Sequence, residues 1–343
     1  MAVTYNEMQD TFNALKKTAI YIEEKWADIE AFLKGKSRFV FIGCGSSYSN
    51  AKSYAMICNM SVGKPAIALA AGDILLHAER YRKAIDGALV VIISRSGRTS
   101  ELLMALNTLK AQDIKFTVAS IISADDTPLG EMSDFVLSTP WAFDESVCQT
   151  RCVTNAYFLA AYIMAKITGD EATLADLELI ITEGPGYAAK AEALAKELAV
   201  QPWTHAVVLA DAEIEGLAEE GSLVFKEVCQ LPSSYHHFLD VRHGPMVLIG
   251  KQTLVIAALG KSNELERDLI KDAKAKGAFV VAVTDTAVEL EQGVVCSVFG
   301  KSLSHTAKGI PLIVLCQIIA YFKSLETGAD PDKPTGLDPW ISL

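Results

Sequence analysis

The chain has 343 residues, half of them apolar and about a fifth charged, which is the composition of a globular protein rather than a disordered one. The length allows two domains of ordinary size or one large domain. The formal net charge of −11 argues against nucleic acid and anionic membranes as partners, because both select proteins with a basic surface.

The seven cysteines are scattered, with no CxxC pair and no Cys/His cluster at the spacing of a zinc site. They are Cys44, Cys58, Cys148, Cys152, Cys229, Cys296 and Cys316. We expect free thiols in a reducing compartment, with neither a disulfide nor a structural metal. The first residues contain no apolar signal core, and no window reaches the roughly 18 uninterrupted apolar residues of a membrane span. The sequence therefore predicts a soluble cytoplasmic protein.

Strands and helices are predicted to alternate after a first helix at 6–34. In the first half, the predicted strands are 38–43, 65–70, 87–94 and 115–122, and the predicted helices between and after them are 46–60, 71–81 and 99–112. Continuous Val/Ile runs at this spacing are typical of a parallel sheet that is covered by helices on both faces.

The second half of the chain repeats the pattern of the first. "HAVVLA" at 205–210 matches "RFVFIG" at 38–43, and residues 251–285 match residues 86–120, at a separation close to half the chain. Such a repeat indicates internal duplication of an α/β unit. We therefore predict an α/β fold of two doubly wound, flavodoxin-like parallel-sheet domains, joined by a helical stretch at 171–200 that is broken at "GPG".

The repeat also predicts the domain boundaries. They are 1–34 for an N-terminal helical segment, 35–170 for the first domain, 171–200 for a helical linker, 201–330 for the second domain and 331–343 for a tail over the active site.

Two loops of the first half are rich in hydroxyl groups. "GCGSSYS" (43–49) and "SRSGRTS" (94–100) each follow a predicted strand and lead into a helix. The unpaired N–H groups and partial positive charge of a helix start, together with hydroxyl donors, form a cradle for phosphate. Arg95 and Arg98 would add positive charge. The alternative is that these Ser and Thr residues are ordinary N-caps.

The same loops bear on what else could bind there. Neither is a Walker or GxGxxG motif, so a nucleotide is disfavoured. The equivalent loop of the second half, 258–266, has lost most of the hydroxyl groups. We therefore expect only the first half to hold a phosphate.

At these loops the sequence resembles the sugar isomerase (SIS) domain family. It is most similar to the isomerase half of glutamine–fructose-6-phosphate aminotransferase and to stand-alone phosphosugar isomerases, deaminases and deglycases, over most of residues 35–335. The motifs that carry the resemblance are, in chain order, "CGSSYS" (44–49), "SRSGRTSE" (94–101), "ESVCQTRCVT" (145–154), "GLAEEGSLVFKEVCQ" (216–230), "RHGPMVLI" (242–249) and "GADPDKPTGLD" (328–338).

The resemblance implies two SIS domains and a role for residues in most of these motifs. It assigns phosphate binding to the two loops, with the contacts and charge supplied by Cys44, Gly45, Ser46, Ser47, Ser94, Arg95, Ser96 and Thr99. It implies that Val147 and Gln149 face the sugar, and that Glu227 is the base that moves a proton between C1 and C2. His243 would open the sugar ring. In the family this histidine reaches the site from the neighbouring subunit, so a homodimer with shared active sites is implied, and no cofactor or metal is required.

The local sequence around Glu227 and His243 also bears on their predicted roles, independently of the resemblance. Residues 213–228 place apolar side chains at helical spacing, and Glu227 lies at the edge of this face, where burial would raise its pKa toward that of a proton shuttle. A structural role for this boundary glutamate stays open. The other acidic residues of the helix are expected to include ordinary solvated positions: Glu215, Glu219 and Glu220. The turn "RHGP" fixes the surroundings of His243, whereas the remaining histidines are expected to be packing or surface residues: His77, His205, His236, His237 and His305.

The sequence departs from the family pattern at both ends. Residues 1–34 form only a helix with no N-terminal cysteine, so we expect no glutaminase domain. The tail carries Asp338 and Pro339 where the aminotransferases have an imine-forming lysine, and no lysine follows Lys333. Ring opening through an imine is therefore not expected.

The sequence also departs from the pattern inside the site. Arg95 and Arg98 stand where glutamine and glutamate are usual, and Gln149 stands where serine is usual. The arginines predict a more cationic pocket, and Gln149 indicates a different sugar.

These features favour a phosphosugar isomerase that acts on an amino- or amine-substituted hexose 6-phosphate. The reaction would be an aldose–ketose isomerisation, alone or coupled to deamination or deglycation. The alternative is a sugar-phosphate-binding regulator without catalysis, which would need neither Glu227 nor His243. A nucleotide-dependent kinase or dehydrogenase would need a phosphate-loop motif that the sequence lacks.

Overall fold

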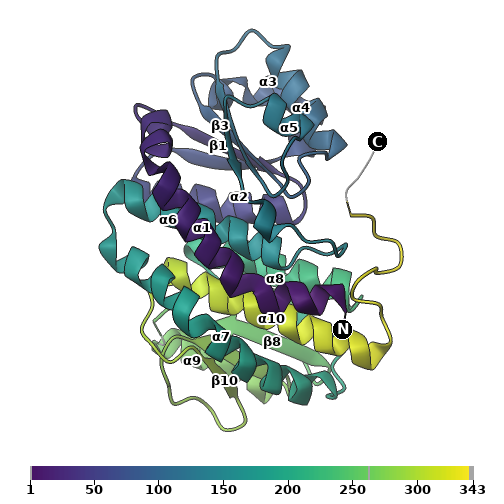
Figure 1. Ribbon diagram of the computed structural model, residues 1–343. Helices are drawn as coiled ribbons and strands as arrows, with labels where there is room; N and C mark the ends of the chain where they lie inside the picture. Colours follow the sequence, from purple (N-terminus) through teal and green to yellow (C-terminus); the bar gives the residue numbers. More distant parts are fainter. Residues whose placement is uncertain (1, 262, 340–343) are drawn as a thin grey trace. The chain divides into compact units, whose positions relative to one another are not determined.

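The computed structural model describes residues 2–261 and 263–339, which form two compact units with one sheet each (Figure 1). The first-sheet unit consists of residues 13–145, 149–174 and 338–339. The second-sheet unit consists of residues 2–12, 146–148, 175–261 and 263–337. Helix α1 (Val3–Leu33) contributes residues to both units.

The first-sheet unit is built on five parallel strands in the order β2-β1-β3-β4-β5. The strands are β1 (Phe39–Gly43), β2 (Ala66–Ala70), β3 (Leu89–Ser94), β4 (Thr117–Ile122) and β5 (Phe135–Ser138). Its helices, besides α1, are α2 (Ser46–Ile57) with a π-helical turn at Cys58–Val62, α3 (Ala71–Ile85), α4 (Ser100–Lys110), α5 (Pro128–Glu131) and α6 (Arg151–Thr168).

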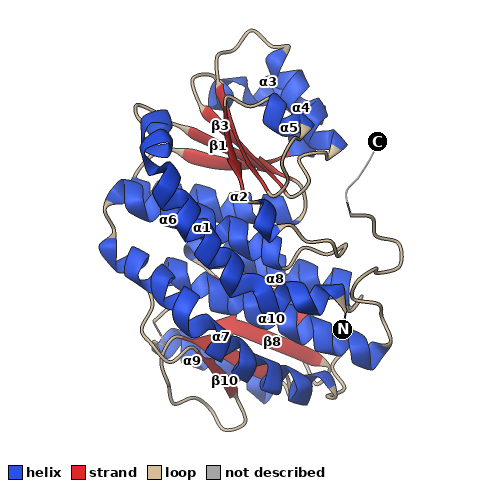
Figure 2. Ribbon diagram, in the orientation of Figure 1, coloured by secondary structure: helices blue, strands red, loops and turns tan. Residues whose placement is uncertain are grey.

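Helices cover both faces of this sheet, as Figure 2 shows for α3 and α4 on one side and α2 and α6 on the other. Successive residues of a strand point to opposite faces. Val40 accordingly packs with Ile74 of α3 and Leu102 of α4 in one core cluster, whereas Phe39 and Phe41 face the other side. Burying each such side chain contributes about 1.5–3 kcal/mol, which explains why the strands are continuous apolar runs.

The second-sheet unit has five parallel strands in the order β10-β9-β8-β6-β7. They are β6 (His205–Ala210), β7 (Ser233–His237), β8 (Thr253–Ala258), β9 (Phe279–Thr284) and β10 (Val295–Val298). The helices are α7 (Glu171–Ala199), α8 (Glu215–Val228), α9 (Glu264–Ala275) and α10 (His305–Thr327). Numbered from the first strand of each unit, the two sheets have the same strand order, with β6 in the place of β1 and β8 in the place of β3. The predicted α/β class with two parallel sheets is confirmed.

The predicted break at "GPG" is wrong, because α7 runs without interruption from Glu171 to Ala199 with Pro185 inside it. Proline costs the helix one hydrogen bond, and packing compensates for it. A Cβ at Gly184 would meet the ring of Phe12 at 2.1 Å, so the glycine allows α1 to approach closely. Tyr187 is buried and donates its hydroxyl to the carbonyl of Pro311 at 2.9 Å.

Helix α10 is, within the described chain, the one helix long and apolar enough to cross a membrane by length and composition. Its most apolar window is 83% buried inside the unit, and the helix packs against α8. Its apolar character is therefore that of a core helix.

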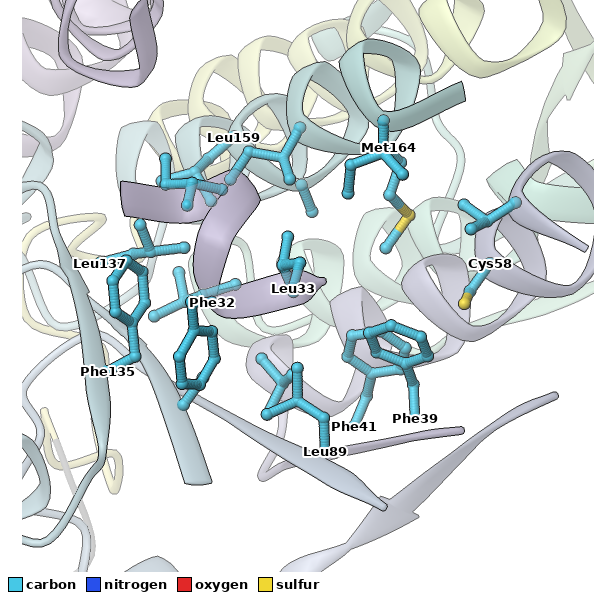
Figure 3. A pocket seen from close by; sticks show the side chains of 18 residues that line it. Phe32, Leu33, Phe39, Phe41, Cys58, Leu89, Phe135, Leu137, Leu159 and Met164 are labelled. Carbon is cyan, nitrogen blue, oxygen red and sulfur yellow. The ribbon is translucent and has the colours of Figure 1, made fainter. Parts of the chain in front are cut away.

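A wholly apolar cavity of about 70 Å³ lies in the first-sheet unit, between the sheet and helices α1 and α6 (Figure 3). Phe39, Phe41 and Leu89 line it from the strands, and Phe32 and Leu159 line it from the helices. A cavity with no polar group stays dry. At about 24 cal/mol per Å³, an empty space of this size lowers the stability of the fold by roughly 1.7 kcal/mol relative to a filled one.

We expect Ala119→Val on β4 to stabilise the protein by about 0.5–1 kcal/mol, because two added methyl groups would fill part of this cavity without leaving the strand conformation. Ala257→Val on β8 is the matched control: Ala257 is fully buried in the packed core of the second sheet, where extra volume destabilises. Urea denaturation measures both changes. A loss of stability in Ala119→Val would show that this space cannot accept atoms.

Candidate functional site

The two hydroxyl-rich loops leave adjacent strands at the same edge of the first sheet. Strand β1 pairs in parallel with β3, with Phe39 opposite Leu89 and Ile42 opposite Ile92. In open parallel sheets, ligands bind beyond the carboxyl ends of the strands. Both loops begin at these ends, so the fold brings the predicted phosphate-binding segments to neighbouring positions.

The loop after β1 is a tight turn that requires glycine. Gly45 has a φ of 53°, and a Cβ on Gly43 would meet the backbone of Ser47 at 2.4 Å. Ser46 and Ser47 follow in the first turn of α2 and are only 4% and 5% exposed. Among the described residues, neither hydroxyl has a hydrogen-bond partner, and no side chain caps α2.

Cys44 precedes this turn and is half-buried. Burial raises the pKa of its thiol to about 11. The thiol is therefore protonated at neutral pH and is not a nucleophile.

The loop after β3 is folded by its own serines. Ser94 accepts a hydrogen bond from the N–H of Gly97 at 3.0 Å, and Ser96 accepts one from the N–H of Arg98 at 3.2 Å. A hydroxyl that accepts a hydrogen bond can still donate its proton. Thr99 is the N-cap of α4 but its side chain makes no capping hydrogen bond, so the N-cap alternative is not realised at this residue.

The two arginines of this loop donate to carbonyl groups. Arg95 is buried, and its guanidinium donates to the carbonyls of Asp144 at 3.3 Å and Pro339 at 2.6 Å. Arg98 is exposed and donates to the carbonyl of Asp126 at 3.0 Å. Both guanidinium groups thus place positive charge near the loop while being held by backbone acceptors.

Asp144 organises the segment that leads into α6. Its carboxylate accepts hydrogen bonds from the N–H groups of Thr150 at 2.8 Å and Cys152 at 2.9 Å, which supplies the first turn of α6 with an anion. Arg151 pairs with the same carboxylate at 3.5 Å. Gln149, predicted to face the sugar, lies within this segment and is partly exposed.

Residues 146–148 belong to the second-sheet unit. Val147, the other predicted sugar contact, is buried and donates its N–H to the carbonyl of Asp332 at 3.2 Å. Ser146 donates both its N–H and its hydroxyl to the buried carboxylate of Glu7. The position of Val147 therefore depends on α1 and on the C-terminal segment.

Asp332 also caps α1. Its carboxylate accepts hydrogen bonds from the N–H groups of Val3 and Thr4, both at 2.8 Å, and from the hydroxyl of Thr4. Burial alone would raise the pKa of Asp332, but these hydrogen bonds from Thr4 and Val3 favour the charged form and hold the pKa below its ordinary value. Neither Asp332 nor Glu7 was predicted from the sequence, because an acidic residue whose partner is about 140 to 330 positions away leaves no local pattern.

Glu227 lies near the end of α8 and is partly exposed. The apolar face predicted for this helix is present, because Leu217, Val224 and Phe225 are fully buried. Glu220 is also fully buried, so the expectation of a solvated position is wrong for this residue. Its helical spacing from Leu217 and Val224 puts it on the apolar face, and this spacing in the sequence could have been used to predict its burial.

His243 is exposed in the turn between two short 3₁₀ helices, Asp240–Arg242 and Pro245–Leu248. Gly244 holds a φ of 123° next to it, so the turn is fixed as the "RHGP" motif predicts. Among the described residues, its ring has no hydrogen bond or ion pair. The imidazole is accessible to solvent and to a second chain.

The equivalent loop of the second sheet already contains an anion. The buried carboxylate of Glu266 accepts hydrogen bonds from the N–H groups of Gly260 at 2.6 Å, Lys261 at 3.3 Å and Asn263 at 2.9 Å. These are the donors that would otherwise bind a ligand anion. This arrangement gives a physical reason to expect phosphate only in the first-sheet unit.

One segment of the chain matches a known protein family. Residues 32–164 match the family model described as "SIS domain". This segment of the chain is similar to the SIS domain family. The resemblance inferred from the motifs is thereby confirmed, and the two hydroxyl-rich loops lie inside the matched segment.

Curated relatives extend the similarity beyond the SIS domain. Isomerizing glutamine–fructose-6-phosphate aminotransferase from Sulfolobus acidocaldarius is 25% identical over 98% of this chain and 54% of its own length. The enzyme of the same name from Caldanaerobacter subterraneus is 28% identical over 77% of this chain and 46% of its own length. The chain thus spans about half the length of the curated relatives it matches.

Solved structures agree with the fold. Glucosamine-6-phosphate deaminase from Thermotoga maritima is 25% identical, with a TM-score of 0.80 and full coverage of both chains. Tagatose-6-phosphate ketose/aldose isomerase from Escherichia coli has a TM-score of 0.87 over 99% of this chain and 96% of its own, at 18% identity. The second similarity bears on the fold alone.

We expect Asp332→Ala to lower the free energy of unfolding by about 1–2 kcal/mol at neutral pH, the usual cost of losing a helix cap. Because folding lowers the pKa of Asp332, its contribution is complete above the pKa of unfolded aspartate, 3.8, and is lost as the pH falls through the lower folded pKa. Urea denaturation between pH 3 and 7 should show the two proteins converging in acid. Asp268→Asn, at an exposed position of α9, serves as the control. A difference that is constant with pH would contradict the role of the ionised carboxylate.

Proposed function

We propose that this protein is an enzyme that isomerises an amino- or amine-substituted hexose 6-phosphate between its aldose and ketose forms. Deamination and deglycation are extensions of the same proton transfer. The observation that carries the proposal is the pair of hydroxyl-rich loops on adjacent strands β1 and β3. The relatives, named for reactions of hexose or amino-sugar 6-phosphates, support it.

Phosphate recognition is assigned to the first-sheet unit. Ser46 and Ser47 supply two hydroxyl donors in the first turn of α2, and the loop after β3 supplies Ser94, Ser96 and Thr99. Cys44 and Gly45 contribute backbone, and Arg95 contributes positive charge. Binding energy from the phosphate, which does not react, is used to orient the sugar for the proton transfer.

The proton transfer is assigned to Glu227. The carboxylate would take the proton from C2 of an aldose, leaving a cis-enediol or enamine, and return it to C1 to give the ketose. A positioned base of this kind is worth typically ~10²–10⁴-fold in rate. Val147 and Gln149 are proposed to contact the sugar.

Ring opening is assigned to His243 of a second subunit. The exposure of its ring fits a site that another chain completes, and Val247 and Leu248, which follow it, are apolar and 79% and 72% exposed. We therefore propose a homodimer with shared active sites in the cytoplasm. The shared strand order of the two sheets supports a further proposal, that a second SIS domain arose by duplication.

Glu227→Gln should abolish exchange of solvent deuterium into C1 and C2 of fructose 6-phosphate or glucosamine 6-phosphate, with a loss of at least ~10²-fold. Its affinity for the sugar phosphate should be unchanged, because the phosphate contacts are intact. NMR in heavy water measures exchange, and calorimetry measures affinity. Glu264→Gln, at an exposed position of α9, is the matched control. Tight binding by the wild-type protein without any exchange would favour a non-catalytic regulator instead.

Ser47→Ala and Ser96→Ala should each weaken binding of a hexose 6-phosphate by roughly tenfold to a hundredfold, the range for one hydrogen bond to a charged group. Ser133→Ala is the control, since that hydroxyl donates to the carbonyl of Leu129 in the same unit. Equal affinity in all three variants and the wild type would place the phosphate elsewhere.

A further inference from the structure

Arg95 lies in the proposed phosphate loop, yet its side chain is directed at two other segments. It is 4% exposed. One terminal nitrogen donates to the carbonyl of Asp144 at 3.3 Å and the other donates to the carbonyl of Pro339 at 2.6 Å. The guanidinium carbon lies 5.7 Å from the ring centroid of Phe143, within the range of a cation–π contact.

The two acceptors belong to different segments of the chain. Asp144 begins the segment that holds the start of α6 through the N–H groups of Thr150 and Cys152. Pro339 belongs to the C-terminal tail, and Asp338 and Pro339 pack with the first-sheet unit. One buried side chain therefore connects the loop after β3, the start of α6 and the tail.

Arginine is better suited to this connection than lysine. The planar guanidinium presents several donors in a fixed fork, so it can hold two acceptors at once. A buried cation without acceptors is unfavourable, so the two carbonyls and the guanidinium stabilise one another. Arg98, three residues later, is exposed and donates to the carbonyl of Asp126, which is in neither the segment before α6 nor the tail.

We propose that Arg95 is a positioning residue that fastens the C-terminal tail to the phosphate loop, so that phosphate binding and ordering of the tail are coupled. The coupling rests on the proposed function, whereas the fastening of the tail does not. By reciprocity, a ligand that orders the loop also orders the tail, and an ordered tail strengthens ligand binding by the same factor.

The test combines Arg95→Ala, Arg95→Lys, a chain truncated after Leu337, and the truncated chain with Arg95→Ala. Hydrogen exchange at the amides of residues 335–338 should become about tenfold faster in Arg95→Ala.

Fructose 6-phosphate and glucosamine 6-phosphate should bind about tenfold more weakly to Arg95→Ala and to the truncated chain, within the usual range of coupling between sites. The double variant should bind no more weakly than Arg95→Ala alone, because truncation then removes a contact that is already lost. Arg95→Lys should recover part of the loss, and Arg82→Ala, at an arginine of the same unit that donates to the carbonyl of Asp113, is the matched control.

Two results would overturn the proposal. If the tail amides exchange equally fast in the wild type and Arg95→Ala, the arginine does not fasten the tail. If Arg95→Ala weakens binding equally in the full and truncated chains, Arg95 acts on the phosphate directly or supports the segment before α6. The truncated chain with Arg95 intact provides the comparison if Arg95→Ala does not fold. A wild-type protein that binds neither sugar phosphate would contradict the proposed function, while the exchange measurement would still test the fastening of the tail.

Discussion

The parallel pairing of β1 with β3 is the constraint on which the rest of this account depends. It places the ends of two strands side by side, so that loops separated by about 50 residues in the sequence start from one edge of the sheet. Continuous apolar burial on both faces fixes the register of these strands, because a slip by one residue would exchange the two faces. The hydroxyl groups of Ser47 and Ser96 are thus positioned by the packing of side chains that have no chemistry of their own.

Hydrogen-bonded carboxylates, in addition to apolar packing, hold several segments of both units. Asp144 fixes the start of α6, Asp332 fixes the start of α1, and Glu266 occupies the loop of the second sheet. Each is a carboxylate that accepts hydrogen bonds from backbone N–H groups. The equivalent loops of the two units therefore differ. In the second-sheet unit, an internal carboxylate accepts the hydrogen bonds of the loop N–H groups, whereas in the first-sheet unit serines and a threonine line the loops.

The sequence predicted the elements wherever a strong periodic signal existed. Strand β6 was predicted to the residue, and β1, β2, β3 and β4 were placed within two residues of their ends, because continuous Val/Ile runs have few alternatives. The prediction failed where a distant contact decides the structure. Pro185 does not break α7, because Gly184 lets Phe12 pack against it. Glu220 is a different case, because its helical spacing between Leu217 and Val224 could have been used to predict its burial. The anchoring roles of Glu7 and Asp332 depend on partners far along the chain, so no local pattern could have indicated them.

A crystal structure with glucosamine 6-phosphate or fructose 6-phosphate would test the central claim most directly. We expect a phosphate group at the carboxyl ends of β1 and β3, with its oxygens about 3 Å from the hydroxyls of Ser47 and Ser96. A sugar phosphate bound with these two loops empty, or with its phosphate group held by the loop that contains Glu266, would contradict it.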